Sequence, residues 1–259
     1  MNYIGIDIGS TCAKTVVLNE KKEIIQEFVQ PTGWSSVDTA EEIHQKLELA
    51  GINLSNDSSC CVATGYGRIS VPYADKTVTE ITCHALGAVH LFQQPDLTVI
   101  DIGGQDTKII QIEQGFVKDF IMNDKCAAGT GRFLEMMART LEISTAELGP
   151  VSKDWKENIE ISSMCSVFAE SEVISLIAQN KEKADIAHGI HNAIAGKAIS
   201  LLKRVGIEGV CMMTGGVAKN SGVVRSLEEK LGTKLYISEE PEIVGALGAA
   251  LFALENLEK

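Results

Sequence analysis

The sequence predicts an α/β protein built from two similar lobes, and three observations support this. Residues 6–14 are repeated at residues 100–108 without a gap, and five of the nine aligned positions are identical. In both copies a short apolar run ends in Asp-Ile-Gly, followed by a polar turn and further short apolar runs typical of strands. Apolar residues at helical spacing come later in each half. We therefore expect one lobe over residues 1–95 and a second over residues 96–259.

Local patterns predict the individual elements. In the first lobe, apolar and β-branched runs bounded by turns predict strands at residues 3–8, 14–18, 23–29 and 60–64. Helical spacing of apolar residues predicts helices at residues 37–50 and 77–92. In the second lobe we expect strands at residues 97–102, 108–112, 116–122 and 209–213. The helices expected there are residues 129–141, 167–179, 184–205, a segment from the glycine turn to 231, and 243–257.

Composition excludes several classes of function. Lys and Arg total 23 against 35 Asp and Glu in 259 residues, and this net charge of -12 argues against binding to nucleic acid or to an anionic membrane. The sequence has no run near the roughly 20 apolar residues that span a bilayer, and strand-like sequence follows Met1 almost at once. We expect a cytoplasmic protein. Its seven cysteines show no disulfide framework, which leaves reduced thiols or metal ligands.

The repeated turn has the properties of a phosphate-binding loop. Gly and small residues after the strand let backbone N–H groups approach a phosphate, while the preceding carboxylates, Asp7 and Asp101, suit Mg²⁺ held through water. No P-loop or dinucleotide-binding glycine pattern is present. One such turn alone would be explained as a tight turn, but two copies and a later Thr-Gly-Gly turn favour phosphate binding. The candidate loop residues are Gly9, Ser10, Thr11, Cys12, Ala13 and Lys14, and Gly103, Gly104, Gln105 and Asp106.

These loops resemble those of the actin, sugar-kinase and Hsp70 ATPase superfamily. The resemblance implies a duplicated actin-like (ribonuclease H-like) fold with two lobes, which holds ATP or ADP with Mg²⁺ between them. It implies catalytic roles for Asp7 and Asp101, and for Gln105 as the group that places the attacking water. Further nucleotide contacts are implied at Gly129, at Gly215, Gly216, Val217 and Asn220 in the adenosine loop, and at Gly245 and Ala246 near the base.

Two cysteines lie beside expected helix starts. Cys126 precedes Ala-Ala-Gly-Thr-Gly-Arg-Phe, and Cys165 follows Ser-Ser-Met, whose serines are candidate N-caps. The positive end of a helix dipole stabilises a thiolate, so two such thiolates could hold one soft metal centre. Two ligands do not complete the usual set of four, so a closed site would require a second copy of the chain. From spacing alone, two buried packing cysteines remain an alternative.

The sequence around these cysteines resembles the 2-hydroxyacyl-CoA dehydratase activators (archerases) and the related benzoyl-CoA reductase ATPase subunits. The likeness runs along the whole chain, including the segments 63–68, 101–106, 123–133 and 165–173. It implies a homodimer bridged by one oxygen-sensitive [4Fe-4S] cluster, held by Cys126 and Cys165 of each subunit. It also implies that ATP hydrolysis drives an electron to a partner iron–sulfur enzyme, and that ferredoxin or flavodoxin resupplies it.

Residues 30–34 depart from the pattern of dehydratase activators. This segment looks more like a branch that serves double-cubane cluster proteins, so the partner is either such a protein or a dehydratase-like enzyme. Trp34 within it is either a docking residue or a loop residue packed on its own lobe. The other cysteines, at positions 12, 60, 61, 83 and 211, are expected to be packing residues.

Two other functions compete with the activator. A small-molecule (sugar) kinase shares the ATPase core, but the sequence shows no convincing sugar-binding segment. A kinase function would also leave Cys126 and Cys165 unexplained. A non-catalytic module in which zinc bridges two chains and nucleotide controls docking is the other alternative.

Overall fold

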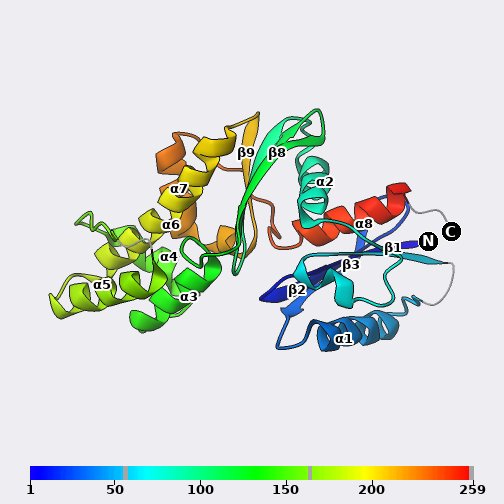
Figure 1. Ribbon diagram of the computed structural model, residues 1–259, viewed down its shortest axis with the longest axis horizontal. Coiled ribbons are helices and arrows are strands. Elements are labelled where there is room, and N and C mark those ends of the chain that lie inside the picture. Colours follow the sequence, from blue (N-terminus) through cyan, green and yellow to red (C-terminus); the bar gives the residue numbers. More distant parts are fainter. Residues whose placement is uncertain (55–57, 163–164, 257–259) are drawn as a thin grey trace. The chain divides into compact units, whose positions relative to one another are not determined.

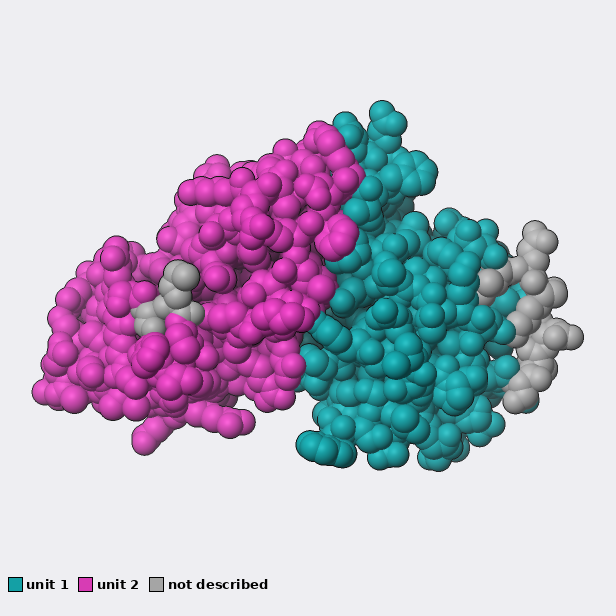
Figure 2. All heavy atoms as spheres, viewed as in Figure 1, with its two compact units in different colours: residues 1–96, 112–117, 242–259 teal, residues 97–111, 118–241 magenta. Residues whose placement is uncertain are grey.

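The computed structural model describes residues 1–54, 58–162 and 165–256. Contacts between residues divide the chain into two compact units, coloured in Figure 2. Unit 1 comprises Met1–Asp96, Ile112–Val117 and Glu242–Lys259, and unit 2 comprises Leu97–Gln111 and Lys118–Pro241. A single boundary at residue 95 places residues 242–259 in the second lobe, whereas in the structure they belong with the N-terminal unit.

Unit 1 is built on a five-stranded sheet in the order β3 (Ile24–Pro31), β2 (Cys12–Leu18), β1 (Asn2–Ile8), β4 (Ser59–Thr64), β5 (Lys76–Thr77). The central strand β1 runs antiparallel to β2 and parallel to β4. This register pairs Asp7, near the end of β1, with Lys14 on one side and Thr64 on the other.

Helices cover both faces of this sheet (Figure 1). On one face Ile4, Ile6 and Ile8 pack with the apolar side of α1 (Ser36–Leu49). On the other face lie α2 (Glu80–Phe92) and α8 (Val244–Asn256). The Ala- and Leu-rich α8 packs on Val16 and Leu18 of β2. This burial of α8 explains why the C-terminal segment belongs to unit 1.

Unit 2 contains a four-stranded sheet in the order β8 (Phe116–Asn123), β7 (Thr107–Glu113), β6 (Leu97–Ile102), β9 (Val210–Thr214). Strands β6 and β9 are parallel, and their register pairs Asp101 with Thr214. The same relation pairs Asp7 with Thr64 in unit 1. Each unit therefore places an aspartate and a threonine side by side at the ends of two parallel strands.

Five helices of unit 2 follow in the order α3 (Gly131–Thr140), α4 (Thr145–Val151), α5 (Ser166–Ala178), α6 (Lys183–Val205) and α7 (Ser221–Leu231). Ile100 and Ile102 of β6 share one hydrophobic core with Phe133 of α3, Ile190 of α6 and Val223 of α7. Short 3₁₀ turns η1 (Tyr66–Ser70), η2 (Ser152–Asp154) and η3 (Gly216–Lys219) complete the described chain. No helix among the described residues is long and apolar enough to cross a membrane.

Most expected elements are present, with shifted ends. The helix expected from residue 77 begins only at Glu80, because the Thr79 side chain accepts a hydrogen bond from the Thr82 N–H and caps it there. The helix expected from residue 129 begins at Gly131. The short α4 was not expected; Ser144 and Glu147 form a capping box at its start.

Candidate functional site

The first candidate phosphate loop connects β1 to β2 in unit 1. Asp7 is buried at the end of β1, with Oδ2 3.4 Å from Lys14 Nζ. The N–H of Gly9 donates to the Cys12 carbonyl at 3.1 Å and closes the turn. A buried aspartate near the end of β1 is thus followed directly by a tight backbone turn.

Thr32 fixes this loop from the neighbouring strand. Its N–H donates to the Thr11 carbonyl at 2.9 Å, and its hydroxyl donates to the Gly9 carbonyl at 2.7 Å. The Thr11 hydroxyl oxygen is buried and has no hydrogen-bond partner among the described residues. Because buried polar atoms are normally satisfied, this hydroxyl fits contact with a bound phosphate or a hydrated metal ion.

The second candidate loop, in unit 2, is more heavily charged. Lys108 Nζ lies 3.1 Å from Asp101 Oδ2 and 2.7 Å from Asp106 Oδ2, and all three side chains are buried. The Gly103 N–H donates to the Asp106 carbonyl at 3.0 Å, which repeats the turn of the first loop. Gln105 is exposed at the tip of the loop. The cluster thus offers two carboxylates, and carboxylate oxygens are ligands that suit Mg²⁺ directly or through water.

A Thr-Gly turn stands beside the aspartate in both units. In unit 2 the Thr214 hydroxyl donates to Asp101 Oδ1 at 2.7 Å. Gly215 follows with φ 83°, and a Cβ there would overlap the Ile102 carbonyl and lie 2.9 Å from Asp101 Oδ1. In unit 1 Gly65 has φ 82°, and a Cβ there would overlap Asp7 Oδ1. Only glycine fits this left-handed backbone at so close an approach.

Thr64 and Gly65 are thus the unit 1 counterparts of Thr214 and Gly215, and neither is among the site residues expected from the sequence. The signal that could have found them is the Thr-Gly pair that directly follows a buried strand in both halves.

The other predicted nucleotide contacts lie in three different surroundings. Gly245 lies beside the first loop, since a Cβ on it would be 3.0 Å from Asp7 Oδ2. Asn220 caps α7, because its Oδ1 accepts hydrogen bonds from the first N–H groups of that helix. Ala13, Val217 and Ala246 are buried in the hydrophobic cores. Any contact of these three with a nucleotide would have to come from the backbone.

The structure differs from the sequence prediction in where Cys126 lies relative to a helix, but agrees with it for Cys165. Cys126 lies in a loop four residues before Thr130, the N-cap of α3, so the expectation that it directly precedes a helix is wrong. Cys165 is itself the N-cap of α5. Of the two serines expected to cap this helix, Ser162 bonds to the Glu172 carboxylate instead, and Ser163 lies outside the described residues.

Exposure distinguishes these two cysteines from four of the other five, while Cys12 in the first loop is half-buried like Cys126. Cys165 is exposed and Cys126 is half-buried, whereas Cys60, Cys61, Cys83 and Cys211 are buried. Burial raises the pKa of Cys83 to about 12 and also raises the pKa of Cys211. Low thiolate character agrees with the expected packing role. In residues 1–54, 58–162 and 165–256, no three His, Cys, Asp or Glu side chains gather into a metal site.

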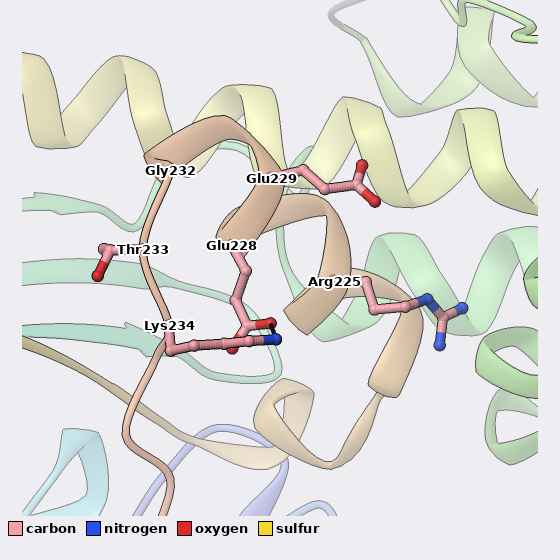
Figure 3. A pocket seen from close by; sticks show the side chains of 6 residues that line it. All are labelled: Arg225, Glu228, Glu229, Gly232, Thr233 and Lys234. Carbon is pink, nitrogen blue, oxygen red and sulfur yellow. Dashed lines mark hydrogen bonds and ion pairs between the residues drawn. The ribbon is translucent and has the colours of Figure 1, made fainter.

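Two further features lie on the surface of the units. Trp34 is fully exposed, so the alternative in which it packs on its own lobe is wrong. A shallow pocket on α7 and the turn after it is shown in Figure 3 and contains none of the predicted site residues. Its lining includes Glu228 and Lys234, whose charged atoms pair at 2.6 Å. That pair holds the end of the helix to the next turn.

Comparison with known proteins identifies the family. The sequence matches the BadF/BadG/BcrA/BcrD ATPase family over residues 4–253. The chain belongs to this family. This ATPase is 45% identical over 257 residues to the (R)-2-hydroxyglutaryl-CoA dehydratase activating ATPase of Acidaminococcus fermentans, covering 99% of this chain and 98% of the relative. The resemblance stated from the sequence is confirmed.

Solved structures agree with this assignment. The A. fermentans (R)-2-hydroxyglutaryl-CoA dehydratase component A has a TM-score of 0.93 and 44% identity, and the match covers 100% of both chains. The activator of the 2-hydroxyisocaproyl-CoA dehydratase from Clostridium difficile, solved with bound ADPNP, has a TM-score of 0.91 and 40% identity, covering 98% and 95% of the two chains.

A glucokinase from Streptomyces griseus is similar at a TM-score of 0.62 with 14% identity, which shows a shared fold alone. The predicted actin-like fold of the ATPase is confirmed, and the sugar-kinase alternative gains no support.

Proposed function

We propose that this ATPase is an activator that couples ATP hydrolysis to the transfer of a low-potential electron. The electron would leave a [4Fe-4S] cluster held by Cys126 and Cys165 of two chains and pass to a partner iron–sulfur enzyme. A 2-hydroxyacyl-CoA dehydratase or a double-cubane cluster protein fits that role. The observation that carries the proposal is the full-length likeness to an ATPase named as activating a dehydratase.

The two cysteines of one chain fit half of a cluster site. A [4Fe-4S] cluster takes four thiolates, and the described residues of one chain hold no complete metal site. Cys165 is exposed at the start of α5, and Val167 and Phe168, two and three residues later, leave large apolar side chains in solvent at 62% and 69% exposure. Exposed apolar side chains beside an exposed thiol fit burial against a second copy of the same chain. A homodimer would therefore complete the ligand set.

Nucleotide would be held by the two phosphate loops, with Mg²⁺ bound through water near Asp7 and Asp101. When bound, Mg²⁺ neutralises the phosphate oxygens and stabilises the charge that develops on the leaving group. The exposed Gln105 side chain is free to orient a water at the terminal phosphate from the tip of its loop. Thr11 supplies a hydroxyl that the described residues do not satisfy.

Other parts of the proposal follow from the same role. A ferredoxin or flavodoxin would return the electron to the cluster, and the protein would be oxygen-sensitive and act in the cytoplasm. The net charge of -12 argues against nucleic acid or an anionic membrane as a partner.

Iron analysis of the anaerobically purified protein tests the proposal against the zinc-bridged alternative. We expect about four irons and four sulfides per dimer, and an EPR signal after reduction with dithionite. Cys126→Ser and Cys165→Ser should each lose the iron, whereas Cys211→Ala, a buried cysteine of the same unit, should retain it. A colourless protein that contains zinc, or a Cys126→Ser variant with full iron, would contradict the proposal.

A further inference from the structure

The second phosphate loop is hydrogen-bonded directly to the start of α3. The Gly131 N–H donates to the Gly103 carbonyl at 2.9 Å, and the Arg132 N–H donates to the Gly104 carbonyl at 2.8 Å. The first backbone donors of a helix have no partner within the helix, so here the loop supplies their acceptors. Any shift of the loop backbone must therefore move the start of α3 or break these two bonds.

A third bond joins the same loop to the segment before α3. The hydroxyl of Thr107 donates to the Gly129 carbonyl at 2.9 Å, and both groups are buried. Gly129 has φ 89°, and a Cβ on it would lie 2.8 Å from Cγ of Lys197. The bond thus fixes a backbone position that only glycine fits.

The segment held by Thr107 is the one that carries Cys126. Its backbone is tied internally, since Asn123 Nδ2 donates to the Cys126 carbonyl at 3.0 Å and the Thr130 hydroxyl donates to the Ala127 carbonyl at 2.6 Å. Successive carbonyls of this loop therefore have fixed donors. A displacement at Gly129 is passed along a short, bonded backbone to Cys126, three residues away.

The repeat shows that this connection is particular to unit 2. In the aligned segments Ala13 occupies the position of Thr107, and Lys14 that of Lys108. Ala13 has no hydroxyl, and it packs in the hydrophobic core with α1. Unit 1, which has no candidate cluster cysteine, therefore lacks the hydroxyl that bonds the Gly129 carbonyl in unit 2.

We propose that Thr107 is a positioning residue that couples the nucleotide state of the second phosphate loop to the backbone of the segment carrying Cys126. The meaning of this coupling for electron transfer rests on the proposed function, but the coupling itself does not. When a nucleotide shifts the loop, the Thr107 hydroxyl and the carbonyls of Gly103 and Gly104 carry the shift to residues 126–132. Asp106, beside Thr107, pairs with Lys108 of β7 at 2.7 Å, and this pair ties the end of the loop to the strand that follows it.

Hydrogen exchange measured by mass spectrometry tests this inference on the intact purified protein. Amide exchange in residues 124–129, which excludes the Gly131 and Arg132 amides bonded directly to the loop, is compared without nucleotide and with saturating ADPNP and Mg²⁺, after calorimetry has established saturation for each variant. The variants are Thr107→Val, which keeps shape and removes the hydroxyl, and Thr107→Ser, which restores it. Thr15→Val is the matched control, because Thr15 is fully buried on β2 of unit 1 and its hydroxyl makes no hydrogen bond among the described residues.

In the wild type we expect ADPNP to change the exchange rate of these amides by about fivefold, the factor that one net hydrogen bond contributes. Thr107→Val should lose most of this response while Thr107→Ser and Thr15→Val keep it. The inference is overturned if ADPNP leaves the segment unchanged in the wild type, or if Thr107→Val responds as the wild type does. It is also overturned if Thr107→Ser fails like Thr107→Val. Iron content of the same samples separates the Thr107 coupling from the proposed function. A protein without iron whose residues 124–129 still respond to ADPNP through Thr107 would contradict only the proposed function.

Discussion

The hydroxyl of Thr214 donates a 2.7 Å hydrogen bond to Oδ1 of Asp101, across the parallel pair of strands β9 and β6. Both side chains are buried, so the carboxylate cannot recover this bond from solvent. Thr214→Val should therefore lower the free energy of unfolding by about 1–3 kcal/mol. Urea denaturation measures it, with Thr15→Val as the control that removes a hydroxyl without a hydrogen bond. If Thr214→Val and Thr15→Val lower the free energy of unfolding equally, the hydrogen bond to Asp101 does not contribute to stability.

The lysines of the two loops, Lys14 and Lys108, should contribute unequally to the free energy of unfolding. Lys108 is buried between two carboxylates, at 2.7 and 3.1 Å, so Lys108→Met removes the ammonium group that pairs with both. We expect a loss of about 3 kcal/mol or more. Lys14 is more exposed and lies 3.4 Å from its aspartate, so Lys14→Met should cost less. Chemical denaturation of both variants checks this order, and a larger loss from Lys14→Met would contradict it.

The glycine of the Thr-Gly turn should not accept a side chain. Gly215→Ala places a Cβ on the Ile102 carbonyl at φ 83°, so we expect lower stability and a loss of ATP hydrolysis. Gly196→Ala is the matched control, because Gly196 lies in α6 with no atom within 4 Å of the added Cβ. That change should stabilise the protein by about 0.5–1 kcal/mol. Thermal unfolding measures the change in stability, and phosphate release measures ATP hydrolysis. Unaltered hydrolysis in Gly215→Ala would contradict a role of this turn in holding the nucleotide.

A buried histidine should make the protein sensitive to acid. Burial, with smaller contributions from Arg225 and His188, lowers the pKa of His191 from 6.5 to about 3. The unfolded chain binds a proton at this residue below pH 6.5, whereas the folded chain does not do so until about pH 3. This contribution to stability is therefore complete above pH 6.5 and is lost as the pH falls, by up to about 1.4 kcal/mol per pH unit.

Denaturation at a series of pH values compares the wild type with His191→Leu. The variant should show a shallower loss of stability between pH 6.5 and pH 4, because it has no proton to gain on unfolding at this position. Parallel curves would show that other groups cause the acid sensitivity.

The repeat made much of the fold predictable. Asp-Ile-Gly after an apolar run appears twice with Lys seven residues after the aspartate, and in both units that lysine pairs with that aspartate. The strands and most helices follow from the same patterns. The threonine beside each aspartate was harder to predict, because parallel strand pairing brings Thr64 next to Asp7 and Thr214 next to Asp101 from distant parts of the chain.

Three other features depend on tertiary contacts that local patterns do not contain. The C-terminal helix α8 packs on β2 of unit 1, although a division by sequence order places it in the second lobe. The start of α3 is set at Gly131 by the carbonyls of the second phosphate loop, which leaves Cys126 in the loop before the helix. Ala13 matches a loop pattern but belongs to the core.

The proposed function requires that two copies of this ATPase share one iron–sulfur cluster. Native mass spectrometry of the anaerobically purified protein tests this most directly, because it counts chains and metal atoms in one species. We expect a dimer that carries the mass of one [4Fe-4S] cluster and separates into monomers when a chelator removes the iron. A monomer without iron, or a dimer with one cluster on each chain, would contradict it.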